Sequence, residues 1–165
     1  MSGKQSGPGP RKRHRARNVE PKHHDTYASE AKPAGAQVCD TCGLVQVAGR
    51  WSRAEPPVDA VRGALCPACQ RTRDRHPAGT IRVPARLLAP RDEIVRLIRH
   101  TEQAEAETHP LERIMAIDDD GDGILVTTTG LHLARRIADQ LARRLHAKPS
   151  LHYGEENEVR VAWEG

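Results

Sequence analysis

The chain has 165 residues, of which 37% are hydrophobic and only 2% are aromatic, so it can build only a modest core and no aromatic platform for stacking bases. Its formal net charge is +4, and no stretch has the roughly 20 consecutive apolar residues of a membrane-spanning helix. The N-terminal residues lack the apolar segment of a signal peptide, so we expect a soluble cytoplasmic protein with no membrane partner.

Positive charge is concentrated toward the N-terminus. Residues 1–36 hold eight Lys or Arg against three acidic residues, a net charge of +5, and residues 37–76 have a net charge of +2. Residues 77–165 have a net charge of −3. The first half of the chain is therefore the part that we expect to face a polyanion.

Residues 1–36 are predicted to form a disordered basic tail, because they combine Gly, Pro, Ser, Lys and Arg with almost no large apolar side chain. Such a segment cannot bury enough surface to offset the entropy of ordering. We assign a cluster of five cations in this tail to nucleic-acid binding: Arg11, Lys12, Arg13, Arg15 and Arg17.

Two Cys-x2-Cys pairs lie in residues 37–76, and twenty-three residues separate them. The ligands that they offer are Cys39, Cys42, Cys66 and Cys69. In a reducing compartment this spacing predicts one structural Zn²⁺ in a zinc ribbon, and four thiolates leave no coordination position for water or substrate. The alternatives are an iron–sulfur cluster, a redox dithiol pair or simple buried cysteines.

Residues 77–90 contain three prolines and are predicted to be a linker with one short strand at Thr80–Val83. Residues 91–165 are predicted to be a small α-β-β-α-β-β domain in which helices cover an antiparallel sheet. The fold class is therefore α+β, with an N-terminal four-cysteine zinc ribbon.

Helical periodicity places the two helices of this domain from Arg91 to just before His109 and from Leu131 to His146. Runs rich in branched aliphatic residues, or alternating in polarity, predict its strands. These runs are residues 113–117, 124–128, 150–153 and 158–163.

The second helix of the domain carries two pairs of arginines that are candidates for contacting a phosphate backbone. They are Arg135, Arg136, Arg143 and Arg144. The alternative is a solvated helix face whose arginine stems cover the edge of the sheet. The same helix opens with Thr128, Thr129 and Gly130, a candidate phosphate-binding turn, although ordinary helix capping explains these residues as well.

Other polar groups point more weakly to a site. Asp118, Asp120 and Asp122 follow calcium-loop spacing, but the twelfth position of such a loop lacks the required glutamate, which favours an acidic hairpin turn. His109 and His132 are not in a ligand spacing, so we expect structural or solvated roles for them. No phosphate loop, nucleophile elbow or His-Glu-x-x-His motif occurs, and we expect no enzymatic activity.

Three further stretches, together with the cysteine pairs, carry a resemblance to known proteins: His109–Ile114, Thr127–Ile137 and Val159–Trp163. With them, residues 37–163 resemble a family of small bacterial zinc-ribbon proteins without an assigned activity. More distantly they are similar to the N-terminal part of the archaeal and eukaryotic export adaptor for the large ribosomal subunit. The resemblance implies a ribosome or ribosomal-RNA ligand and no catalysis.

These observations together predict a non-catalytic zinc-ribbon protein that binds RNA, in particular ribosomal RNA or ribosomal particles, with an affinity that is mainly electrostatic. A protein partner would contact residues 91–165. One alternative is a DNA-binding regulator, although no helix-turn-helix pattern is present. The other is an enzyme that acts on a phosphorylated small molecule at the Thr127–His132 turn.

Overall fold

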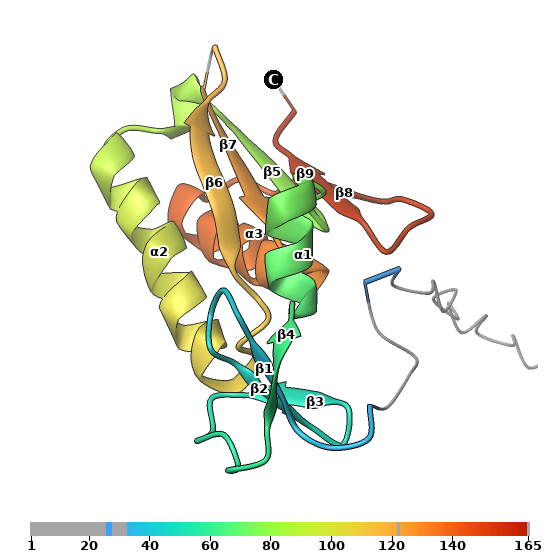
Figure 1. The fold of residues 1–165 in the computed structure, drawn as a ribbon. Coiled ribbons are helices and arrows are strands. Elements are labelled where there is room, and N and C mark those ends of the chain that lie inside the picture. The colour runs from blue at the N-terminus through green and yellow to red at the C-terminus, as the bar shows by residue number, and fades with distance from the viewer. Residues whose placement is uncertain (1–25, 28–32, 122, 165) are drawn as a thin grey trace, which may run out of the picture.

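A computed structural model describes residues 26–27, 33–121 and 123–164 of the chain. The basic tail predicted for residues 1–36, with its cluster of five cations, lies almost entirely outside the described residues. Within them the chain forms a small N-terminal sheet and a larger sheet covered by two helices (Figure 1). No described helix combines the length and the apolar character needed to cross a bilayer.

The N-terminal sheet has four short strands in the order β3-β2-β1-β4. They are β1 (Gln37–Cys39), β2 (Val45–Val47), β3 (Arg50–Ser52) and β4 (Val61–Ala64). β1, β2 and β3 are antiparallel, whereas β4 runs parallel to β1. The two-residue turn between β2 and β3 has positive φ at both Ala48 and Gly49, which is the backbone that suits the twist of a tight hairpin.

A helix that the sequence analysis did not predict, α1 (Pro67–Asp74), follows this sheet. It begins directly after Cys66, and Pro67 occupies its first turn, where a missing N–H costs nothing. It ends at Arg75, which adopts a left-handed conformation. A helix of eight residues surrounded by turns gives little periodic signal in the sequence.

The larger sheet has five strands in the order β6-β7-β5-β9-β8. Its strands are β5 (Gly79–Pro84), β6 (Ile114–Asp119), β7 (Gly123–Thr128), β8 (Ser150–Tyr153) and β9 (Val159–Ala162). Its helices are α2 (Arg91–Thr108) and α3 (Leu131–Leu145), and a short 3₁₀ turn, η1 (Ala85–Leu87), follows β5. The α+β fold class and both long helices are confirmed.

The strand predicted at Thr80–Val83 is confirmed as part of β5, but residues 77–90 as a whole do not form a linker. β5 is the central strand, antiparallel to β7 and parallel to β9. The elements of the domain therefore follow the order β-α-β-β-α-β-β along the chain, and its sheet is mixed rather than wholly antiparallel. The prolines do not interrupt the strand because Pro77 precedes it and Pro84 is its last residue.

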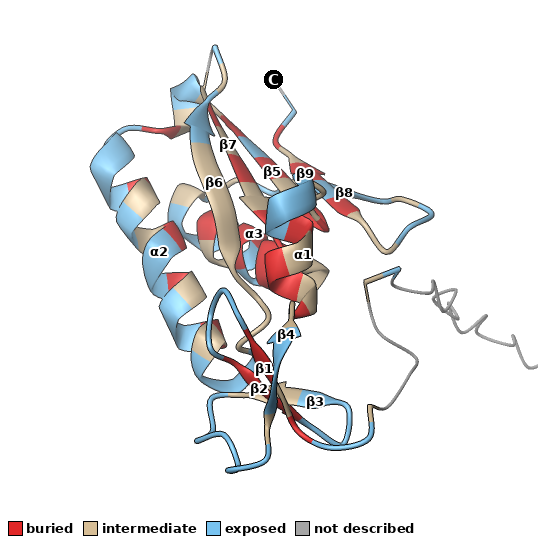
Figure 2. Cartoon of the chain, viewed as in Figure 1, coloured by how far each residue is buried: buried red, intermediate tan, exposed pale blue. Residues whose placement is uncertain are grey.

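Both long helices pack on one face of the larger sheet and form its core with it (Figure 2). Ile81 and Val83 of β5 alternate with exposed or partly exposed residues and are fully buried beneath the helices. α3 crosses the start of β5 so closely that a Cβ on Gly79 would lie 2.4 Å from Cβ of Ala134. Only glycine allows this close approach of helix and strand.

Candidate metal centre

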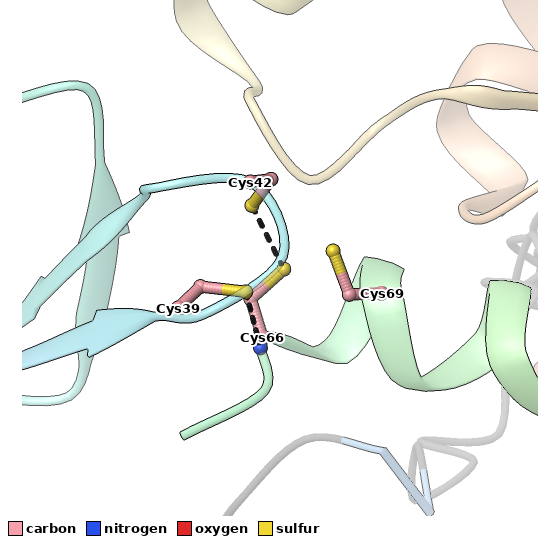
Figure 3. Close-up of side chains that lie close together, drawn as sticks. All are labelled: Cys39, Cys42, Cys66 and Cys69. Carbon is pink, nitrogen blue, oxygen red and sulfur yellow. Dashed lines mark hydrogen bonds between the residues drawn. The ribbon is translucent and has the colours of Figure 1, made fainter. Parts of the chain in front are cut away.

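The four cysteines of the two Cys-x2-Cys pairs come together where the N-terminal sheet meets α1 (Figure 3). Their sulfur atoms all lie within 4.8 Å of one another, and Sγ of Cys42 is 3.6 Å from Sγ of Cys66. Cys39 ends β1, and Cys69 lies in the first turn of α1. All four are free thiols. This arrangement is compatible with a structural metal ion.

Local backbone geometry holds the first pair in position. The N–H of Cys39 donates to the carbonyl of Leu44 at 2.8 Å, and the N–H of Gly43 donates to the carbonyl of Cys39 at 2.9 Å. Gly43 has a φ of +74°, which allows the chain to reverse immediately after Cys42. The resulting tight turn brings the side chains of Cys39 and Cys42 to the same side.

The thiols of the cluster differ in their tendency to ionise. Burial opposes ionisation of Cys39, but hydrogen bonds from backbone N–H groups, that of Cys66 first, outweigh it and lower its pKa to about 6. Burial raises the pKa of the Cys66 and Cys69 thiols. A cation placed among the sulfurs would favour the thiolate form of all four.

Arg113, from the larger domain, lies against the cysteine cluster. Its Nη2 is 3.2 Å from Sγ of Cys42, and its Nη1 is 3.6 Å from Sγ of Cys69. Burial lowers its pKa, but the contact with Cys42 outweighs this effect and the pKa is raised. The side chain is held in place because its Nε donates to the carbonyl of Pro110 at 3.0 Å. A fixed cation therefore faces the sulfur atoms.

Arg113 was not predicted as a site residue, and no local signal in the sequence would have identified it. It lies 71 positions beyond Cys42, just before β6, and belongs to no cysteine motif. The backbone is fixed by Thr129, whose hydroxyl accepts from the N–H of Arg113 at 2.8 Å and whose own N–H donates to the carbonyl of Arg113 at 2.8 Å. Only the packing of the two domains brings this side chain to the cysteines.

By its fold and its candidate site, the protein is thus a small α+β protein in which four clustered cysteines lie beside a sheet covered by helices. Comparisons of the chain with models of known protein families, with curated proteins and with solved structures found no match.

The predicted phosphate-binding turn at Thr128, Thr129 and Gly130 is contradicted by the structure. Both threonines are buried, and their hydroxyls donate to carbonyls of the chain, Thr128 to Gly130 at 2.8 Å and Thr129 to Leu111 at 2.6 Å. The N–H of Leu133 in the first turn of α3 donates to Glu112 at 2.8 Å. The Glu112 carboxylate therefore takes the place that a phosphate would occupy at this helix terminus.

The four arginines of α3 separate into two classes. Nε of Arg136 is 2.7 Å from Glu105, and Nη2 of Arg144 is 2.7 Å from Glu93, so both bridge α3 to α2. Arg135 and Arg143 are exposed, and no carboxylate in the described part of the chain pairs with them. Contact with a phosphate backbone therefore stays a prediction for Arg135 and Arg143. Arg136 and Arg144 pair with carboxylates of α2, a role that neither of the two interpretations included.

The acidic turn between β6 and β7 makes ion pairs within the protein. Asp119 lies 2.5 Å from Nη2 of Arg91, and Asp120 lies 2.5 Å from Nη1 of Arg82. Asp122 lies outside the described residues. Two of the acidic side chains thus have cationic partners within the protein, as expected for a hairpin turn.

Proposed function

We propose that this chain is a non-catalytic zinc-ribbon protein that binds RNA, with ribosomal RNA or ribosomal particles as its ligand. The observation that carries the proposal is the cluster of four sulfurs within 4.8 Å of one another. Tetrahedral zinc with bonds of about 2.3 Å to sulfur requires S···S distances of about 3.8 Å. The 3.6 Å between Cys42 and Cys66 fits this requirement. Such a site stabilises the fold and offers no position for a substrate.

Exposed arginines support the RNA part of the proposal. Arg50, Arg53 and Arg62 are exposed on the N-terminal sheet and its loops, and none of them forms a salt bridge with another described residue. Arg135 and Arg143 add two more such cations on α3. Guanidinium groups that lack a carboxylate partner can bind phosphate with release of counterions. The free thiols are consistent with the reducing cytoplasm, where thiolate metal sites persist.

The division of the α3 arginines provides a charge-matched test. The full chain is bound to a ribosomal RNA fragment at a series of salt concentrations, with the variants Arg135→Gln/Arg143→Gln and Arg136→Gln/Arg144→Gln. Both variants lose two positive charges. We expect the first to keep its melting temperature and to flatten the slope of log affinity against log salt by about 0.7 for each phosphate that it no longer binds. The second should melt at a lower temperature and keep its salt slope, because its arginines pair with Glu105 and Glu93.

Equal slopes of log affinity against log salt for the wild type and the first variant would show that the arginines of α3 do not contact the RNA.

A duplex DNA of the same length, measured at the same salt concentrations, is the competing ligand. Tighter binding to the duplex than to RNA would contradict the proposal and favour the DNA-binding alternative.

A further inference from the structure

A second group of metal-ligand side chains lies where α2 ends and α3 begins, away from the cysteines. It consists of Glu105 on α2, His109 directly after that helix and His132 in the first turn of α3. Their three ligand atoms all lie within 4.8 Å of one another. Oε2 of Glu105 is 2.9 Å from Nε2 of His132 and 3.5 Å from Nδ1 of His109. Structural or solvated roles were expected for both histidines because they are not in a ligand spacing, with twenty-two residues between them in the chain.

Glu105 is positioned to present one oxygen to the two imidazoles. Its side chain is 11% exposed, and its other oxygen, Oε1, accepts a hydrogen bond from Nε of Arg136 at 2.7 Å. The hydrogen bonds from Arg136 and His132 outweigh the effect of burial and lower the pKa of Glu105. A carboxylate that binds a metal ion through one oxygen is usually held by a hydrogen bond from a second-sphere group, and Arg136 is placed to hold Glu105 in this way.

The charges around the cluster suit a divalent cation. Glu112, half-buried beside the start of α3, interacts electrostatically with both histidines and with Glu105. Two carboxylates and one guanidinium therefore surround two imidazoles. The histidine side chains are 53% and 46% exposed, so the face of the cluster opposite Glu105 is open to solvent.

We propose that Glu105, His109 and His132 bind a divalent first-row transition ion of the zinc type, with at least one coordination position open to water or an anionic oxygen. Tetrahedral zinc with bonds of about 2.0 Å to nitrogen and oxygen needs ligand atoms about 3.3 Å apart. The distances of 2.9 and 3.5 Å lie on either side of this value. Two imidazoles and a carboxylate are the donor set of open zinc sites, in contrast to the four thiolates of the closed centre.

Two existing contacts involve the nitrogens that would bind the ion. Nε2 of His132 and Oε2 of Glu105, which lie 2.9 Å apart, would exchange their direct hydrogen bond for bonds to the ion. The Thr108 hydroxyl lies 2.9 Å from Nδ1 of His109, the nitrogen that faces Glu105. Binding of the metal replaces this exposed hydrogen bond, which makes only a small contribution to stability. The proposal does not depend on RNA binding.

Cobalt distinguishes the two centres, because Co²⁺ held by thiolates absorbs strongly in the near ultraviolet and Co²⁺ held by nitrogen and oxygen does not. The full chain, first loaded with one equivalent of Zn²⁺, is dialysed against Co²⁺. We expect one bound cobalt per chain with weak visible bands and no thiolate absorption. His109→Ala and His132→Ala should each weaken its binding at least about tenfold. His100 is an exposed histidine on α2, the helix that carries Glu105, and His100→Ala is the matched control that should bind like the wild type.

His109→Ala keeps the hydrogen bonds that join Glu105 to His132 and Arg136, so it tests the site even if His132→Ala unfolds. The proposal is overturned if zinc-loaded wild-type protein binds no cobalt. It is also overturned if folded His109→Ala protein binds cobalt as tightly as the wild type, because the ion would then lie elsewhere in the chain.

Discussion

Arg113 is the residue that connects the two parts of the molecule chemically. Its guanidinium contacts Cys42 and Cys69, while its backbone is hydrogen-bonded to Thr129 between β7 and α3. A divalent ion held by four thiolates carries a net charge of −2, and a fixed guanidinium beside the sulfurs offsets part of it. With an ion in the candidate centre, we therefore expect Arg113 to balance part of its negative charge.

Replacing Arg113 by Gln should accelerate the transfer of metal from the protein to a chromophoric chelator by about tenfold, because the sulfurs lose their neighbouring positive charge. Arg113→Lys should fall between this variant and the wild type, since an ammonium group cannot contact several sulfurs at once. Arg96→Gln, on the exposed side of α2, is the control. Equal release rates for Arg113→Gln and Arg96→Gln would show that Arg113 does not stabilise the centre.

At the scale of elements, β5 decides how the larger domain is assembled. It pairs with β7 over six residues and with β9 over four, so it joins the β6–β7 hairpin to the β8–β9 hairpin. Its fully buried side chains, Ile81 and Val83, lie at the centre of the core. Without this strand the two hairpins have no common partner and leave both helices without a continuous surface to cover.

A fragment of residues 77–165 should therefore fold, whereas a fragment of residues 91–165 should not. Loss of a single buried aliphatic side chain costs about 1 to 5 kcal/mol, and loss of the whole strand exceeds what a domain of this size can tolerate. Circular dichroism during heating provides the measurement. A cooperative transition in the shorter fragment would contradict the central role of β5.

At the scale of the whole molecule, two separate cores differ greatly in size. The larger domain buries fifteen residues around its sheet, including Ile81, Ile98 and Trp163. The N-terminal cluster has only five buried members, of which three are cysteines: Cys39, Leu44, Cys66, Ala68 and Cys69. A core this small does not hold a fold without a cross-link or a metal ion.

Removal of the metal with a chelator, or the substitution Cys66→Ser, should unfold the N-terminal sheet and leave the larger domain folded. Each part contains one tryptophan, Trp51 in the first and Trp163 in the second. Trp51→Phe and Trp163→Phe proteins therefore report on the two parts separately by fluorescence. We expect the Trp51 signal to change on chelation, while the Trp163 signal changes only on heating. A simultaneous change of both signals would mean that the two parts unfold as one unit.

The sequence by itself determined the features that short-range patterns encode. Cys-x2-Cys spacing predicted the cysteine cluster, because two residues between the cysteines allow both side chains to face one point. Helical periodicity predicted α2 and α3 to within one or two residues of their observed ends. The α+β class followed from the alternation of these patterns.

Only the tertiary structure decided which distant residues meet. The central position of β5, the contact of Arg113 with the cysteines and the convergence of His109 and His132 on Glu105 all join segments that are far apart in the chain. Likewise, the pairing of Arg136 and Arg144 with α2 separates them from Arg135 and Arg143, which look identical to them in the sequence. The physical reason is that local spacing fixes which face of a helix or strand a side chain occupies, whereas the packing of helices and sheets around a shared core fixes what lies opposite that face.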